Sequence, residues 1–294
     1  MLSEELSNQA RLRGLRRTLT LSGKEFVYYD YPARLDNSET IVMIHGYRGN
    51  HRGLEAIVGG LGDYRVVVPD LPGFGESSEL SSVHSLDTYA NWLEQFLSEL
   101  GLISTANLVG HSFGTLVVGR YASTRDCKSI VLINPVSGPA LSGPRAFLTR
   151  ITSAFYHLSN LLPEPIGGWL LRSPIAVMVM STVMAKTNDR KLRSWIHKQH
   201  LSNFSDFATV RVATEGYDAS ISSDLSVMAP LITTPVLIVA AELDDITAIE
   251  IQREVVKLYP RAKLVEINNV GHLVHYEAPD QAANFIRPFI EELK

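Results

Sequence analysis

The stretch "NLVGHSFGTLVVGRYA", residues 107–122, decides the fold because it sets a serine between two glycines inside an apolar run. A strand pattern, "ANLVG", passes into a helical pattern, "GTLVVGRYA", with almost no residues between them. A reversal this sharp requires a strained backbone at its apex, and Gly110 and Gly114 relieve crowding on either side. The turn therefore presents the Ser112 hydroxyl above the edge of a sheet, where the free N–H groups of the new helix face any anion that forms.

Short apolar runs alternate with helical patterns over most of the chain. This alternation predicts an α/β fold, with a mostly parallel, twisted sheet and helices on both faces. The expected strands are 25–32 (paired with 16–22), 40–45, 64–70, 106–112, 129–135, 235–242 and 262–268. The expected helices are 51–61, 85–100, 114–124, 247–258 and 279–293.

One long interval lacks buried strands. From Val136 to Thr234, leucines, aromatic residues and methionines recur at helical spacing, and prolines interrupt them. We interpret this interval as an inserted helical cap. The predicted domains are therefore a core of residues 1–135 and 233–294 and a cap of residues 136–232.

The first residues predict a short surface helix before the core. Four leucines would form one stripe along it: Leu2, Leu6, Leu12 and Leu15. This start lacks the apolar centre of a secretion signal.

Composition narrows the class of protein. The chain has 294 residues, of which 45% are hydrophobic and 20% are charged, and its net charge is −4. These values indicate a soluble globular protein that acts on a small-molecule substrate and not on nucleic acid. Its single cysteine, Cys127, excludes an internal disulfide and is expected to be half-buried. The most apolar run, 175–185, is too short to cross a bilayer, so we expect no membrane span and a cytoplasmic location. Composition does not decide between a monomer and a homo-oligomer.

A serine in such a turn needs a base. His272 follows the last expected strand, directly after Gly271 and before a helix that begins near Pro279. A loop there lies over the same edge of the sheet as Ser112. His275 is the alternative base, although three residues further on it is better placed for packing.

The base in turn needs an orienting carboxylate, which should follow the preceding strand. The run "VLIVAAELDDITA" ends its strand near Ala241, and two acids follow. Asp244 is preferred and Asp245 stays open. Asp245 could instead cap the helix expected at 247–258.

Stabilisation of an oxyanion is expected from two backbone groups. "MIHGYRGN" places Gly46 just beyond a buried strand, so the loop can fold back and aim the Tyr47 N–H at the site. The Phe113 N–H, next to the serine, supplies the second donor. The neighbouring Arg48 is interpreted as a solvated surface residue.

Four blocks resemble those of the α/β-hydrolase superfamily, in the same order. They are "HGYRG" (45–49), "DLPGFGESS" (70–78), "GHSFG" (110–114), and "ELDD" with "GHLVHYEAP" near the end. The resemblance covers roughly residues 20–135 and 232–293, and the segment 136–232 occupies the position of the family's cap. It implies Ser112 as nucleophile, His272 as base, Asp244 as acid, and Tyr47 and Phe113 as the oxyanion hole.

Three positions depart from the family pattern. Thr115 and Ala241 stand where glycine is common, and Asp245 stands where proline is common. A serine at position 112 also argues against the relatives that use an aspartate nucleophile, the dehalogenases and epoxide hydrolases.

These features predict a serine esterase of moderate-sized apolar acyl or aryl compounds that works through an acyl-enzyme, with no cofactor or metal. Cleavage of a C–C bond, a lactone or a thioester, or a slow-turnover ligand receptor, remain alternatives. Candidate substrate contacts are Gly46, His111, Met178 and Met180. The methionines are as compatible with ordinary helix packing.

Overall fold

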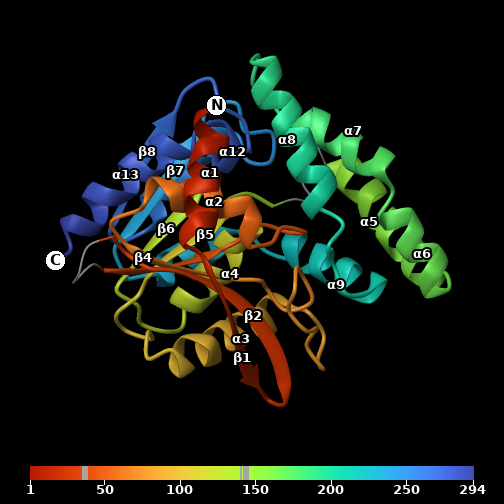
Figure 1. The fold of residues 1–294 in the computed structure, drawn as a ribbon, viewed down its shortest axis with the longest axis horizontal. Coiled ribbons are helices and arrows are strands. Elements are labelled where there is room, and N and C mark those ends of the chain that lie inside the picture. The colour runs from red at the N-terminus through yellow and green to blue at the C-terminus, as the bar shows by residue number, and fades with distance from the viewer. Residues whose placement is uncertain (35–38, 140, 142–145) are drawn as a thin grey trace.

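A computed structural model describes residues 1–34, 39–139, 141 and 146–294. Its centre is an eight-stranded sheet in the order β1-β2-β4-β3-β5-β6-β7-β8 (Figure 1). The strands are β1 Leu15–Leu21, β2 Lys24–Tyr31, β3 Thr40–Ile44, β4 Arg65–Pro69, β5 Asn107–His111, β6 Ser129–Ile133, β7 Val236–Ala241 and β8 Ala262–Ile267. The helices outside the β6–β7 connection are α1 Leu2–Arg13, α2 His51–Gly60, α3 Leu86–Glu99, α4 Phe113–Ala122, α11 Ile249–Val255, α12 Val274–Glu277 and α13 Pro279–Glu291.

The sheet is antiparallel only at one edge. β1 pairs with β2 and β2 pairs with β4 in antiparallel fashion, whereas every pair from β4 to β8 is parallel. All residues of β5, β6 and β7 are buried, as continuous apolar runs in a sheet covered on both faces require. The prediction of a mostly parallel α/β sheet with a helical insertion is confirmed.

Side chains of successive strand residues lie on opposite faces of the sheet and pack into two different hydrophobic clusters. Leu108 of β5 packs with α3 and α4 on one face, and Val109 packs with α2 and α13 on the other. This alternation holds the sheet rigidly between two helical layers, so the loops at the carboxyl ends of its strands have a fixed base.

The observed helices differ from the expected ones by one or a few residues at their ends, and two of these differences bear on the candidate site. α4 begins at Phe113, one residue earlier than expected, because the helix starts directly after Ser112. The helix expected at 247–258 divides into α11 and a 3₁₀ turn, Val256–Leu258. α11 has Ala248 at its N-cap position, so the interpretation of Asp245 as its cap is wrong.

The predicted leucine stripe of the first helix is also wrong. α1 packs on α2 through small side chains, Ser3, Ser7 and Ala10. The backbones approach closely because Gly59 has no side chain: a Cβ there would lie 2.1 Å from the carbonyl oxygen of Leu6. Leu2 and Leu12 consequently face solvent, and Leu15 belongs to β1.

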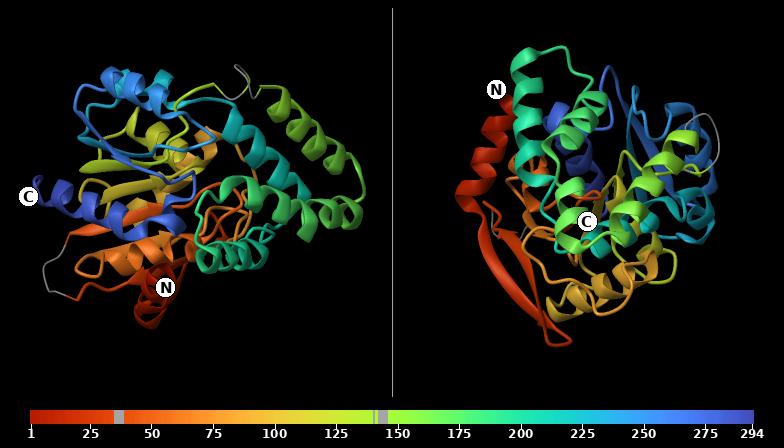
Figure 2. Two further views of the ribbon diagram at one scale, coloured as in Figure 1. Left: turned by 90° about the horizontal axis from the view of Figure 1, so that it is seen from above. Right: turned by 90° about the vertical axis from the view of Figure 1, so that its right-hand side faces the viewer.

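The connection from β6 to β7 carries the helical insertion, which stands beside the sheet (Figure 2). Its helices are α5 Ala146–Leu161, α6 Glu164–Leu171, α7 Pro174–Met184, α8 Arg190–Asn203 and α9 Val210–Ile221. The short helix α10, Leu225–Met228, then packs on α4 and joins the main core. The cap boundaries 136 and 232 stay predictions.

One helical stretch of the described chain is long and apolar enough to cross a membrane by length and composition alone. It runs from Glu164 to Met184 and therefore combines α6 and α7. The sequence analysis did not predict this stretch, because it considered the apolar run 175–185 separately from the residues before Pro174. Proline at 174 divides the stretch into two helices.

Candidate active site

The turn between β5 and α4 has the geometry that its glycines predict. Ser112 adopts φ 54° and ψ −121°, a strained conformation for a residue with a side chain. A Cβ on Gly110 would lie 2.5 Å from the carbonyl oxygen of Gly114, and a Cβ on Gly114 would lie 2.2 Å from that of Ile44. Only glycine fits at both positions. Ser112 is partly exposed, whereas His111 and Phe113 on either side are buried.

Three side chains from three loops meet at this turn. The Ser112 Oγ lies 2.8 Å from His272 Nε2, and His272 Nδ1 lies 2.9 and 3.0 Å from the two carboxylate oxygens of Asp244. The side chains of His272 and Asp244 are each only 2% exposed. Asp244 Oδ1 also accepts the Ile246 N–H at 2.7 Å, which fixes the carboxylate. With His272 Nδ1 donating to Asp244, Nε2 is the acceptor for the serine proton.

The alternative acid and base lie elsewhere. Asp245 forms an ion pair with Lys186, a residue of the insertion. His275 is buried in α12 with its ring 4.1 Å from that of His111, and within the described chain its Nδ1 has no hydrogen-bond partner. Burial lowers the pKa of His275 well below its ordinary value. The structure therefore brings His272 and Asp244, and not their alternatives, to Ser112.

His111 contacts the loop that carries His272, residues 268–273 between β8 and α12, which we call the histidine loop. Its Nε2 lies 3.3 Å from the carbonyl oxygen of His272. Burial, followed by the nearby His272, lowers the pKa of His111 to about 3, so this ring is neutral at physiological pH. A neutral ring adds no competing charge beside His272.

The loop after β3 closes over the serine. A Cβ on Gly46 would lie 3.2 Å from Ser112 Cβ, so the absence of a side chain allows this approach. The Tyr47 hydroxyl donates to the carbonyl oxygen of Ala213 at 2.6 Å, which holds the loop against the insertion. Phe113 begins α4, so its N–H has no acceptor within that helix.

Comparison with known proteins identifies the family of this chain. A model of the alpha/beta hydrolase fold family matches residues 39–279. The chain belongs to the α/β-hydrolase family. Lipase 3 of Moraxella sp. (strain TA144) is 25% identical to it over 95% of this chain and 85% of the relative. Lipase 1 of Psychrobacter immobilis is 26% identical over 93% and 83%. The structure of a thermophilic esterase from Thermogutta terrifontis has a TM-score of 0.74 and 21% identity, covering 95% of this chain and 98% of that one. At the level of the family, these similarities support a hydrolase of the lipase or esterase type.

The "DLPGFGESS" block of this α/β hydrolase now has a physical explanation. Asp70 is buried and its carboxylate accepts the N–H groups of His51 and Glu76, at 2.7 and 3.0 Å. Gly75 has a φ of 56°, and a Cβ there would lie 2.3 Å from an oxygen of Asp70. The same loop bonds to the insertion, since the Gly75 N–H donates to Asp206. The block therefore connects the core to the insertion through hydrogen bonds.

Arg48 corrects the sequence interpretation, which expected a solvated residue. It is 5% exposed, and its guanidinium donates to the carbonyl oxygens of Phe204 and Leu171 and to the Tyr156 hydroxyl. No local sequence signal distinguishes this arginine, because its acceptors lie more than 100 residues away. Arg48 links the loop over Ser112 to three parts of the insertion.

Glu277 is a second residue that sequence reasoning missed. One carboxylate oxygen accepts the N–H groups of Lys186 and Thr187, at 2.7 and 3.1 Å. The other accepts the Gly271 N–H at 3.2 Å, next to His272. Glu277 therefore fastens the loop of the candidate base to the insertion. It stands in the block "GHLVHYEAP", but the pattern alone does not reveal its partners.

One group of side chains in the described part of the chain has the spacing of metal ligands. Ligand atoms of His51, Asp70 and Glu76 lie within 4.8 Å of one another. Glu76 is paired with Arg16 and Tyr29, and both Asp70 oxygens already accept backbone N–H groups. These hydrogen bonds and this ion pair account for the cluster as a structural hydrogen-bond network.

The predicted substrate contacts are divided between two places. Gly46 and His111 lie at Ser112, whereas Met178 lines an apolar groove on the insertion together with other α7 residues and Leu201. Met180 is a half-buried residue of α7. Roles for these four residues in substrate binding stay predictions.

We expect Glu277→Gln to lower both stability and turnover. The amide keeps one acceptor oxygen but turns an NH₂ group toward the remaining N–H donors. Loss of charge-assisted hydrogen bonds should reduce the free energy of unfolding by about 2 kcal/mol. Displacement of Gly271 should lower kcat more than it changes KM. Urea unfolding and steady-state kinetics measure the two effects.

Glu242→Gln is the matched control, since Glu242 accepts a single N–H, that of Asn269, in a neighbouring turn. Equal effects of the two substitutions would contradict the assignment.

Proposed function

We propose that this α/β hydrolase is a serine esterase that cleaves carboxylic esters of moderate-sized apolar acyl or aryl compounds through an acyl-enzyme. The observation that carries the proposal is the hydrogen-bonded chain from Ser112 Oγ through His272 to Asp244, on a partly exposed serine at the start of a helix. The similarity to lipases and an esterase supports the same class of bond.

In this mechanism, His272 Nε2 removes the Ser112 proton as the oxygen attacks the ester carbonyl. The N–H groups of Tyr47 and Phe113 stabilise the negative charge on the former carbonyl oxygen. His272 then protonates the leaving alcohol. Water, activated by the same imidazole, attacks the acyl-enzyme, releases the acid and restores Ser112. Asp244 keeps His272 in the required tautomer.

Residues 136–232 act as a cap that selects the substrate, since the core supplies only the chemistry. The proposal of an apolar substrate is supported by aromatic side chains of the insertion that contact the loop over Ser112. Tyr156 stacks on Tyr217 with ring centroids 4.7 Å apart, and both contact the ring of Tyr47 in the loop over Ser112. A cytoplasmic location belongs to this proposal.

A series of p-nitrophenyl esters, from butyrate to decanoate, tests the function. We expect a burst of nitrophenol followed by steady turnover, because this good leaving group departs in a fast acylation step and the acyl-enzyme is then hydrolysed more slowly. Turnover of lactones or thioesters in preference to every ester would replace the substrate class. Tight ligand binding without turnover of any of these compounds would instead favour a receptor and contradict the proposal.

A further inference from the structure

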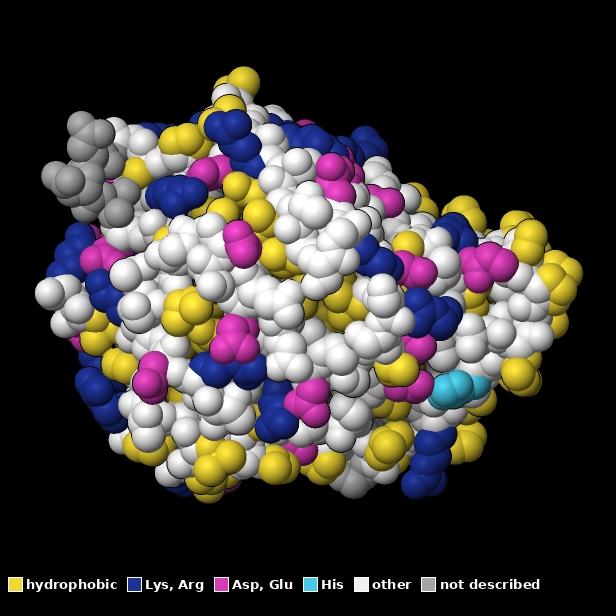
Figure 3. Space-filling model, turned by 90° about the horizontal axis from the view of Figure 1, so that it is seen from below, with side chains coloured by type: hydrophobic (Ala, Val, Ile, Leu, Met, Phe, Trp, Pro, Cys, Tyr) yellow, Lys and Arg dark blue, Asp and Glu magenta, His cyan; other side chains and the backbone are white. Residues whose placement is uncertain are grey.

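The outer surface of the insertion presents an unusual number of apolar side chains to solvent. Trp169 of α6 is 72% exposed, and Ile175 and Val179 of α7 are 76% and 61% exposed. In Figure 3, hydrophobic side chains gather along the right-hand rim, the side on which α5, α6 and α7 lie in Figure 1. Soluble proteins seldom expose a large contiguous apolar patch unless it contacts a partner.

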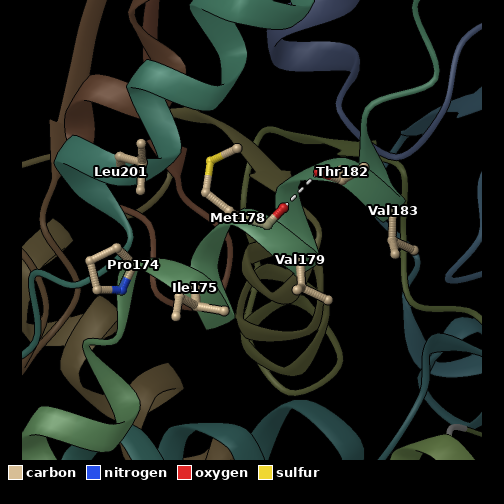
Figure 4. Close-up of a pocket in the computed structure, with 7 residues that line it drawn as sticks. All are labelled: Pro174, Ile175, Met178, Val179, Thr182, Val183 and Leu201. Carbon is tan, nitrogen blue, oxygen red and sulfur yellow. Dashed lines mark hydrogen bonds between the residues drawn. The ribbon is translucent and has the colours of Figure 1, made fainter.

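These side chains form one surface. A groove along α7 reaches Leu201 of α8, and Figure 4 shows Met178 extending from α7 toward Leu201. A second groove runs along α6 past Trp169. Pro174 and Ile175 line both grooves, so the surface is continuous from α6 to α8. We call it the apolar face, defined by Trp169, Ile175, Met178, Val179, Val183 and Leu201.

Positive charge borders the apolar face. Residues 164–203 contain six lysines and arginines and only two acids, in a chain whose net charge is −4. Lys186 is paired with Asp245 and Arg172 donates to Phe207, so the exposed positive charge lies on α8. Both acids are engaged, because Glu164 accepts the Val210 N–H and Asp189 caps α8. On α8, helical periodicity puts Lys191 and Lys198 in the same exposed stripe as Leu201. An apolar surface bordered by lysines matches the boundary between acyl chains and anionic headgroups.

The same charges argue against a second copy of this chain. In a two-fold dimer, this face would meet itself and bring the two sets of lysines together. Like charges directly opposed across an interface are destabilising. A bilayer with anionic lipid complements both components of the surface.

The surface is suited to lie on a bilayer and not to cross it. α6 and α7 are separate helices, and Arg172 at the break donates to the carbonyl oxygen of Phe207. Buried residues on their inner sides, such as Leu171 and Val177, pack into the protein. Crossing a bilayer would break these contacts and leave the backbone at the break without partners.

We propose that the apolar face binds the surface of an anionic phospholipid bilayer, with Trp169, Ile175 and Val179 entering the headgroup–acyl boundary. The C-terminal end of α7 lies beside the histidine loop: a Cβ on Gly271 would be 3.2 Å from the carbonyl oxygen of Met184. Binding therefore brings the candidate active site next to a reservoir of apolar compounds. The proposal rests on the surface and does not depend on the role of Ser112.

Flotation with vesicles tests the proposal on the full chain. Vesicles of phosphatidylcholine with phosphatidylglycerol should recruit the wild type. The double substitution Ile175→Ser with Val179→Ser should reduce the partition coefficient about tenfold or more, because apolar groups no longer enter the bilayer. The matched control is Val227→Ser with Leu231→Ser, two aliphatic residues in and just after α10, away from the apolar face, that are 68% and 60% exposed. This control should bind as the wild type does.

A second pair of substitutions tests the charge. Lys191→Glu with Lys198→Glu should weaken binding to vesicles that contain phosphatidylglycerol and have little effect on the weaker binding to pure phosphatidylcholine. Equal effects on both vesicles would overturn the choice of an anionic surface.

Three results would overturn membrane binding itself. They are a wild type that does not float with either vesicle, an apolar-face variant that floats like the wild type, and a wild-type dimer that this variant converts to a monomer. Hydrolysis of p-nitrophenyl butyrate in vesicle-free buffer should be unchanged in the apolar-face variant. An esterase that fails to bind vesicles, and a vesicle-binding protein without esterase activity, are therefore distinguishable outcomes.

Discussion

Ser112→Ala should lower kcat for p-nitrophenyl butyrate by roughly a million-fold, the order of loss seen when a triad nucleophile or base is removed. His272→Ala should be nearly as damaging, because the serine oxygen and its base work as one unit across the 2.8 Å hydrogen bond. The double variant should lose little more than either single one. Both variants should unfold at the same urea concentration as the wild type to within a modest shift, so lost activity will report chemistry.

His275→Ala is the decisive comparison for the base. Its ring packs against His111 and does not contact Ser112, so its substitution should affect stability more than turnover. His157→Ala, at an exposed site on α5, gives the background for removing a histidine. Retained activity in His272→Ala together with loss in His275→Ala would show that the base is wrongly assigned.

Asp244→Asn should lower kcat by about 10⁴-fold while leaving the fold intact. The asparagine can present its NH₂ group to His272 Nδ1 and so favour the tautomer that carries a proton on Nε2. A protonated Nε2 cannot accept the proton of Ser112. The expected signature is a large loss of kcat with little change in the urea midpoint.

Asp245→Asn is the matched control for the acid. This residue pairs with Lys186, and the two side chains are 25% and 30% exposed. The pair is partly exposed and does not touch Ser112 or His272, so its loss should cost about 1 kcal/mol of stability or less and change kcat by less than about fivefold. A larger loss in Asp245→Asn than in Asp244→Asn would exchange the two assignments.

The sequence predicted the sheet well because its strands are buried on both faces. The centres of the runs "SIVLINP" and "PVLIVAAE", which are "IVLI" (130–133) and "VLIVAA" (236–241), contain no polar residue that would obscure a central strand. The glycines around Ser112 were equally informative, since each excludes a side chain for a steric reason that the structure shows directly.

The hydrogen bonds between the core and the insertion were not predictable in the same way. Most of the partners of Arg48 and Glu277 are backbone groups at distant positions, and a backbone group leaves no trace in the identity of its residue. The choice between Asp244 and Asp245 depended on the path of a short loop, which adjacent acids in a sequence do not reveal. The short helix expected at the start of the chain is present as α1, but its leucine stripe was wrongly predicted, because the buried side consists of small residues and not of the apolar ones that a pattern search detects.

The bonds of Arg48 and Glu277 have a consequence for engineering this enzyme. A chimera that keeps residues 1–135 and 233–294 but takes the intervening helices from a relative would leave the buried guanidinium of Arg48 without acceptors and one carboxylate oxygen of Glu277 without donors. Such a graft should succeed only if the donor segment brings carbonyl groups to Arg48 and two amides to Glu277. Specificity transplants in this chain must therefore match backbone positions before they match pocket side chains.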